Sequence, residues 1–85
     1  DLTMYPQKLI NVRLLAGFDW RNDPGIQAAA ANAETALDGQ GRVLLRPSGT
    51  EPVLRVMVEG RDGNLVLAQA EAIAGAVRQA AATDT

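Results

Sequence analysis

The chain has 85 residues, of which 47% are hydrophobic and 21% charged, a composition that predicts one globular domain with a single core. Cysteine and histidine are absent, which excludes disulfides, Ser-His and Cys-His nucleophiles and nearly every zinc site of ordinary ligand type. The net charge of −2 disfavours nucleic-acid binding, and no apolar run reaches the ~18 residues of a membrane span. We expect a soluble domain with neither a nucleic acid nor a membrane as partner.

The first predicted element is a strand over residues 8–15, because branched apolar side chains alternate with others along it. Its apolar face carries Ile10, Val12 and Leu14. Residues 1–7 are expected to be the end of an interdomain linker, and residues 83–85 a polar tail.

A helix is the second predicted element, after a connector at residues 18–22. Asp23 provides an N-cap for free amides, and Pro24 stands where a helix needs no donor. The alanine-rich body at 26–37 favours helix, and the glycines within 38–41 predict its end, since glycine accepts left-handed backbone.

Two further strands, residues 42–46 and 53–60, are predicted on either side of a loop at 47–52. Side chains alternate between the two faces of a strand. This period places Arg46 and Arg55 on the mixed faces, both next to the loop.

A final helix is predicted over about residues 65–81, after a turn at 60–63, with Asn64 as its N-cap. The resulting order is strand-helix-strand-strand-helix. We therefore predict a small two-layer α+β fold at residues 8–82, with the helices packed on one face of the sheet.

The distinctive chemistry lies in the loop and its two flanking arginines. The backbone amides of Ser48, Gly49 and Thr50 would form an anion nest if Gly49 took positive φ, and two hydroxyls add donors. Arg46 and Arg55 add planar forks suited to phosphate oxygens. A plain turn is the competing interpretation, because Pro, Ser, Gly and Thr are ordinary turn residues.

Three other loop residues are predicted to orient it. Pro47 and Pro52 fix φ at the two shoulders, which lowers the entropy lost on binding. Glu51 would repel an anion unless its side chain turns away to pair with an arginine or to accept backbone N–H bonds. No strong base accompanies the loop, so we predict that it binds a ligand without catalysing a reaction, and we assign no catalytic residue.

The run Gly41–Glu59 resembles the phosphate-binding loop and flanking strands of the last domain of the α-D-phosphohexomutases. Within that superfamily, Arg55–Glu59 is most similar to the bacterial phosphoglucosamine mutases, although phosphoglucomutases and phosphomannomutases carry close variants of the loop. Tyr5-Pro6-Gln7 and the following residues 9–12 resemble the lead into that domain. The resemblance covers nearly the whole chain.

The resemblance implies a cytoplasmic four-domain enzyme that interconverts glucosamine 6-phosphate and glucosamine 1-phosphate, on the route to cell-wall precursors. Its chemistry would pass through a sugar 1,6-bisphosphate, with a phosphoserine in the first domain and Mg²⁺ held by aspartates in the second. This domain would bind no metal. Its partners would be the phosphosugar and the other three domains. By the same resemblance, the substrate phosphate would be held by Arg46, Ser48, Gly49, Thr50 and Arg55.

Two other classes of protein remain open from the residues alone. A free-standing phosphate-binding module could use the same nest for a nucleotide or a phosphopeptide. An assembly domain could use the alanine-rich helices, whose small side chains allow close packing.

Overall fold

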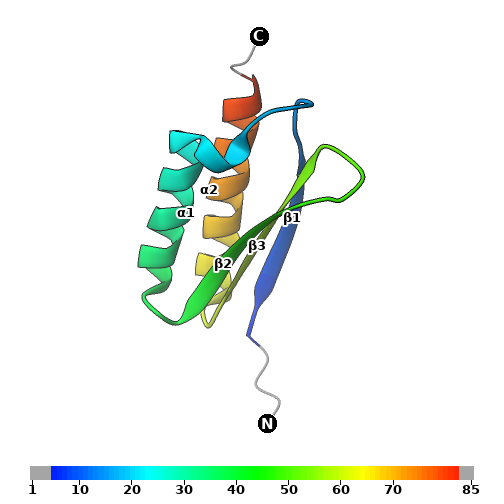
Figure 1. The fold of residues 1–85 in the computed structure, drawn as a ribbon. Helices are drawn as coiled ribbons and strands as arrows, with labels where there is room; N and C mark the ends of the chain where they lie inside the picture. Colours follow the sequence, from blue (N-terminus) through cyan, green and yellow to red (C-terminus); the bar gives the residue numbers. More distant parts are fainter. Residues whose placement is uncertain (1–4, 83–85) are drawn as a thin grey trace.

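The computed structural model describes residues 5–82 and confirms the predicted α+β order (Figure 1). A single turn of 3-10 helix precedes the first α-helix. The elements are β1 (Gln7–Arg13), η1 (Trp20–Asn22), α1 (Pro24–Leu37), β2 (Gly41–Pro47), β3 (Val53–Gly60) and α2 (Gly63–Ala82). β1 begins within the range predicted as linker; residues 1–4 of that range and the predicted tail at 83–85 lie outside the described residues.

The three strands form one antiparallel sheet in the order β1-β3-β2, so β3 is central. In the register, Val56 lies opposite Ile10 of β1 and Leu45 of β2. Figure 1 shows α1 and α2 side by side on one face of this sheet, as predicted, while the other face carries no helix. We call the second face, which carries the odd-numbered residues of β1 and β3 and the even-numbered residues of β2, the open face.

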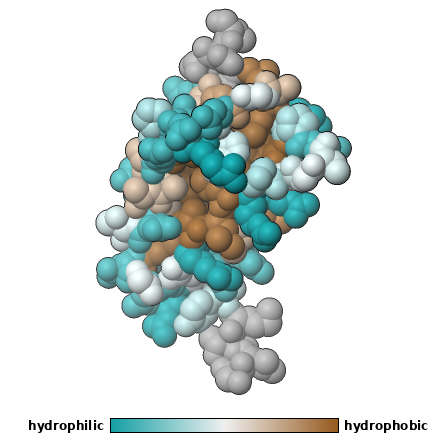
Figure 2. All heavy atoms as spheres, in the orientation of Figure 1, coloured by the Kyte–Doolittle hydropathy of each residue, from teal (hydrophilic) through white to brown (hydrophobic). Residues whose placement is uncertain are grey.

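The hydrophobic core lies between the sheet and the two helices. In β3, Leu54, Val56 and Val58 are fully buried, whereas the alternate residues are not. Of the two helices, α2 contributes more buried residues to the core, and these residues recur at helical spacing. These buried residues of α2 are Val66, Ala70, Ile73, Ala74 and Val77. Figure 2 shows the apolar atoms gathered over the middle of the molecule, with hydrophilic side chains around them.

Helix α1 starts as the sequence predicts and ends slightly differently. The Asp23 carboxylate accepts a hydrogen bond from the Ile26 amide at 3.0 Å. The chain leaves the helix through two left-handed residues, Asp38 at φ 53° and Gly39 at φ 76°. Gly41, expected to take left-handed backbone, instead begins β2, where an added Cβ would overlap the Glu59 carbonyl oxygen. The close approach of β2 and β3 therefore explains why position 41 is a glycine.

The N-cap of α2 is Asp62, not Asn64. The Asp62 Oδ1 atom accepts hydrogen bonds from the amides of Asn64 at 3.0 Å and Leu65 at 3.3 Å. The helix already begins at Gly63, so Asn64 is its second residue and donates to the cap. The prediction was wrong because a cap must stand one residue before the first helical residue, and glycine at 63 concealed where that residue is.

Candidate anion-binding site

Two arginines face each other across the open face of the sheet. Arg46 of β2 and Arg55 of β3 are register partners, and both side chains are exposed. Within residues 5–80, neither forms an ion pair. Like charges directly opposite in an antiparallel pair destabilise a sheet. An anion between the two guanidinium groups would remove that repulsion, so the pair is a candidate anion site.

The loop next to these arginines is tied down at its base. The Ser48 amide donates to the Val53 carbonyl at 2.8 Å, which extends the pairing of β2 and β3 beyond Pro47. The Val53 amide donates to the Glu51 carbonyl at 2.7 Å. The Leu14 amide, just after β1, donates to the Pro52 carbonyl at 2.6 Å. Three separate bonds therefore hold the foot of the loop.

The free amides of the loop lie one residue later than the sequence suggested. Because the Ser48 amide is used within the sheet, it is not available to a ligand. The amides of Gly49, Thr50 and Glu51 donate no hydrogen bond within the described part of the chain. Gly49 does not have positive φ, so that element of the predicted nest is wrong. The loop therefore has three consecutive unpaired amide donors, and it joins the strand ends that carry Arg46 and Arg55.

The side chains of the loop differ in their surroundings. Ser48 is half-buried, whereas Thr50 and Glu51 are exposed. The Glu51 carboxylate has no hydrogen bond or ion pair within residues 5–80, so its orienting role stays a prediction. The Pro52 carbonyl accepts the bond from Leu14, and the orienting roles of Pro47 and Pro52 stay predictions.

An apolar row lies beside the arginines on the open face. Leu9, Met57 and Leu44 are register partners across β1, β3 and β2. Together with Arg46 and Arg55 they line a small hollow of about 150 Å³. Long arginine side chains cover apolar surface with their stems and keep the charge in water. In the register, the row of Arg46 and Arg55 lies between this apolar row and the loop.

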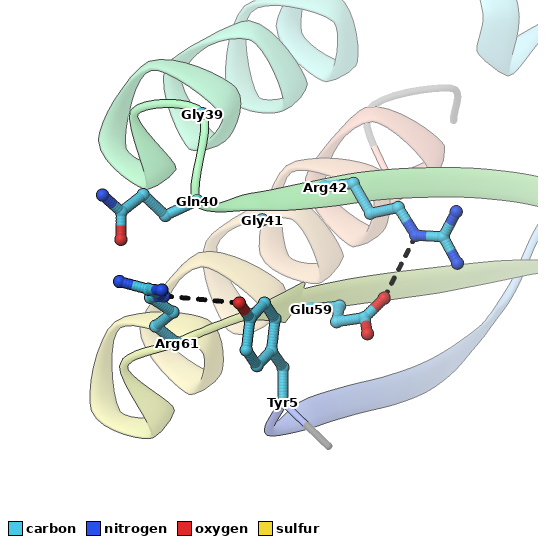
Figure 3. Close-up of a pocket in the computed structure, with 7 residues that line it drawn as sticks. All are labelled: Tyr5, Gly39, Gln40, Gly41, Arg42, Glu59 and Arg61. Atoms are coloured by element: carbon cyan, nitrogen blue, oxygen red, sulfur yellow. Dashed lines mark hydrogen bonds and ion pairs between the residues drawn. The ribbon is translucent and has the colours of Figure 1, made fainter. Parts of the chain in front are cut away.

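A second hollow, of about 570 Å³, lies at the other end of the sheet (Figure 3). Its arginines already have partners: Arg42 Nε lies 3.1 Å from Glu59 Oε1, and Arg61 Nε donates to the Tyr5 hydroxyl at 3.4 Å. This hydrogen bond raises the pKa of Arg61 above its ordinary value. Figure 3 shows the two pairs on opposite sides of the hollow. Glu59 neutralises Arg42, whereas within residues 5–80 Arg46 and Arg55 have no acidic partner, so the loop is the stronger candidate.

Two features are absent from residues 5–82. No three acidic side chains gather in a way that could hold a metal ion, and the chain has no histidine or cysteine. Neither helix of this part is long and apolar enough to cross a membrane.

Taken together, the fold and the site define a small α+β domain with unpaired amides and exposed arginines at one end of its sheet. Residues 9–76 match the family model described as phosphoglucomutase/phosphomannomutase, C-terminal domain. The chain therefore belongs to this family.

Curated relatives from bacteria share most of the sequence. A phosphoglucosamine mutase from Azoarcus sp. is 66% identical over 82 residues, which is 96% of this chain and 18% of the relative. The phosphoglucosamine mutase of Aromatoleum aromaticum is 65% identical over 94% of this chain and 18% of its own length. The chain thus spans less than a fifth of the relatives it matches.

Solved structures agree with the fold. An Aspergillus fumigatus N-acetylphosphoglucosamine mutase superposes with a TM-score of 0.74 and 30% identity, over 93% of this chain and 16% of that one. Another structure of that mutase, in complex with GlcNAc-6P and magnesium, gives a TM-score of 0.71 and the same coverage.

Proposed function

We propose that this chain is the substrate-phosphate-binding domain of a phosphoglucosamine mutase, which interconverts glucosamine 6-phosphate and glucosamine 1-phosphate. The observation that carries the proposal is that Arg46 and Arg55 are register partners next to a loop with three unpaired amides. Identities of 65–66% to phosphoglucosamine mutases over nearly the whole chain support glucosamine phosphates as the proposed substrates.

The donor set suits a phosphate group. Arginine forks match phosphate oxygens bidentately, and consecutive backbone amides add donors from another direction. We assign phosphate contacts to Arg46, Arg55 and the backbone of Gly49 and Thr50, and a hydroxyl contact to Ser48. The half-buried Ser48 has its amide committed to the sheet, so its hydroxyl is the group left for a ligand.

In the proposed enzyme the loop holds the phosphate that is not being transferred. A reaction that passes through a sugar 1,6-bisphosphate needs each phosphate to occupy this position in turn. Donors that stop at the phosphate group allow both orientations. The phosphoserine and the Mg²⁺ ion would belong to other domains, which agrees with the scattered acidic side chains of residues 5–82. The chain alone should therefore bind but not catalyse.

The test is a chemical-shift titration of the isotope-labelled chain at fixed salt, because charge contacts are screened. Glucosamine 6-phosphate, glucosamine 1-phosphate and glucose 6-phosphate should bind within about tenfold of one another, each in the millimolar range. The amides of Gly49, Thr50 and Glu51 should shift most. A clear preference for a nucleotide, or shifts centred on Tyr5 and Arg61, would reject the proposal.

Turnover is the second measurement. The chain should produce no glucosamine 1-phosphate from glucosamine 6-phosphate, with or without Mg²⁺ and a sugar bisphosphate. Measurable conversion by these 85 residues would contradict the assignment of the phosphoryl donor to another domain.

A further inference from the structure

A third arginine stands on the open face at the same end as the loop. Arg13 is the last residue of β1, and its register partner is Val53, the first residue of β3 after the loop. Arg55 lies two residues further along β3 on the same face, so Arg13 and Arg55 are diagonal neighbours. Such neighbours have their Cα atoms about 7–8 Å apart, within reach of long side chains.

Strand β1 lies on the other side of β3 from β2, and the residue after Arg13 contacts the loop. Asn11, the partner of Arg55, completes a row that runs from β1 through Arg55 to Arg46. The amide that follows Arg13, that of Leu14, holds the Pro52 carbonyl at the foot of the loop. The surface next to the loop is therefore bordered by β1 on one side and by β2 on the other.

The charge on this end of the open face is unbalanced. Within residues 5–80, Arg13 forms no ion pair and is exposed, like Arg46 and Arg55. Glu59, the acidic residue of β3 on this face, lies at the opposite end and is paired with Arg42. Three exposed arginines therefore lie at this end of the open face, next to the loop that carries Glu51.

We infer that Arg13 is a further phosphate-binding residue, so that the site spans all three strands rather than the loop and its two flanking strands. This inference rests on the proposed function. A phosphate ester carries nearly two negative charges at neutral pH. A third guanidinium therefore adds attraction that two arginines alone do not supply, and Asn11, two residues before Arg13 and opposite Arg55, adds an amide donor.

The experiment is a titration of the 85-residue chain with inorganic phosphate, in the wild type and in charge-matched variants. Arg13→Gln should raise the dissociation constant about three- to tenfold, and Arg13→Lys, which keeps the charge, should restore part of that loss. Arg78→Gln is the control: it removes the same charge from an exposed position of α2, behind the sheet, and should leave the dissociation constant unchanged.

The variants separate this inference from the proposed function. If Arg46→Gln weakens phosphate binding while Arg13→Gln behaves like Arg78→Gln, Arg13 is not in the site and the inference fails alone. If the wild type shows no saturable shifts in the loop amides, the proposed function fails with it. Urea unfolding of Arg13→Gln should match the wild type, which shows that any loss of binding is not a loss of fold.

Discussion

Arg46 and Arg55 are register partners on a sheet face that no helix covers, and within residues 5–80 neither has an acidic partner. The unliganded chain therefore keeps two like charges side by side. A sheet that tolerates this repulsion loses some stability and gains a surface ready for an anion. Stability and binding should respond in opposite directions when either arginine is removed.

The first prediction follows from that opposition. Arg46→Gln removes a charge-assisted fork and should weaken phosphate binding by ~1.5–3 kcal/mol. The same change relieves the repulsion, so the free energy of unfolding should stay the same or rise by ~0.2–1 kcal/mol. Phosphate titration and urea unfolding measure the two effects. Loss of both binding and stability would show that Arg46 has a structural partner instead.

The second prediction concerns Gly49. Its φ is not positive, and no atom lies within 4 Å of an added Cβ, so Gly49→Ala should change the free energy of unfolding by less than about 1 kcal/mol. Gly39→Ala is the contrasting variant, because Gly39 has equal space but a φ of 76°. That variant should lose ~1 kcal/mol or more. Equal losses in the two variants would mean that the loop needs left-handed backbone after all.

The third prediction tests the close approach of β2 and β3. An added methyl group at Gly41 would overlap the Glu59 carbonyl, a backbone atom that cannot move aside alone. Gly41→Ala should therefore destabilise the chain by ~1–3 kcal/mol. Gly63→Ala is the control, since its nearest contact is Pro6 at 3.7 Å. Thermal unfolding of both variants checks the difference, and a stable Gly41→Ala chain would disprove the contact.

The fourth prediction separates two candidate caps. Asp62→Ala removes the acceptor for the Asn64 and Leu65 amides and should cost ~1 kcal/mol of stability. Asn64→Ala leaves both bonds in place and should change the free energy of unfolding by less than ~0.5 kcal/mol. Urea unfolding of the two variants decides between them. A larger loss of unfolding free energy in Asn64→Ala would show that Asn64 is the N-cap.

Local patterns were enough to predict most of the fold. The alternation in β3 separates buried Leu54, Val56 and Val58 from exposed Arg55, and the α1 start is encoded by Asp23 and its following proline. These features depend on residues close in the chain. The loop motif likewise pointed to Arg46 and Arg55, because they flank it in the sequence, and the sheet places these two residues opposite each other.

Features that depend on pairing between distant segments were not predictable in the same way. The Ser48 amide is unavailable only because the register of β2 and β3 brings it to Val53. Arg13 lies diagonally opposite Arg55 because β1 is the neighbour of β3, an order that the sequence does not state. The contact between Tyr5 and Arg61 joins residues 56 positions apart, and neither residue type signals it.

Strand β3 carries the core and the site on alternate residues of one backbone. Val56 is fully buried beneath the helices, while its neighbour Arg55 is exposed on the open face. Recognition can therefore diverge in evolution by substitutions at odd positions, with the interior left intact. Insertion or deletion of one residue has the reverse effect, because it exchanges the two faces. On its open face this strand should accept many substitutions, but it should accept no insertion or deletion.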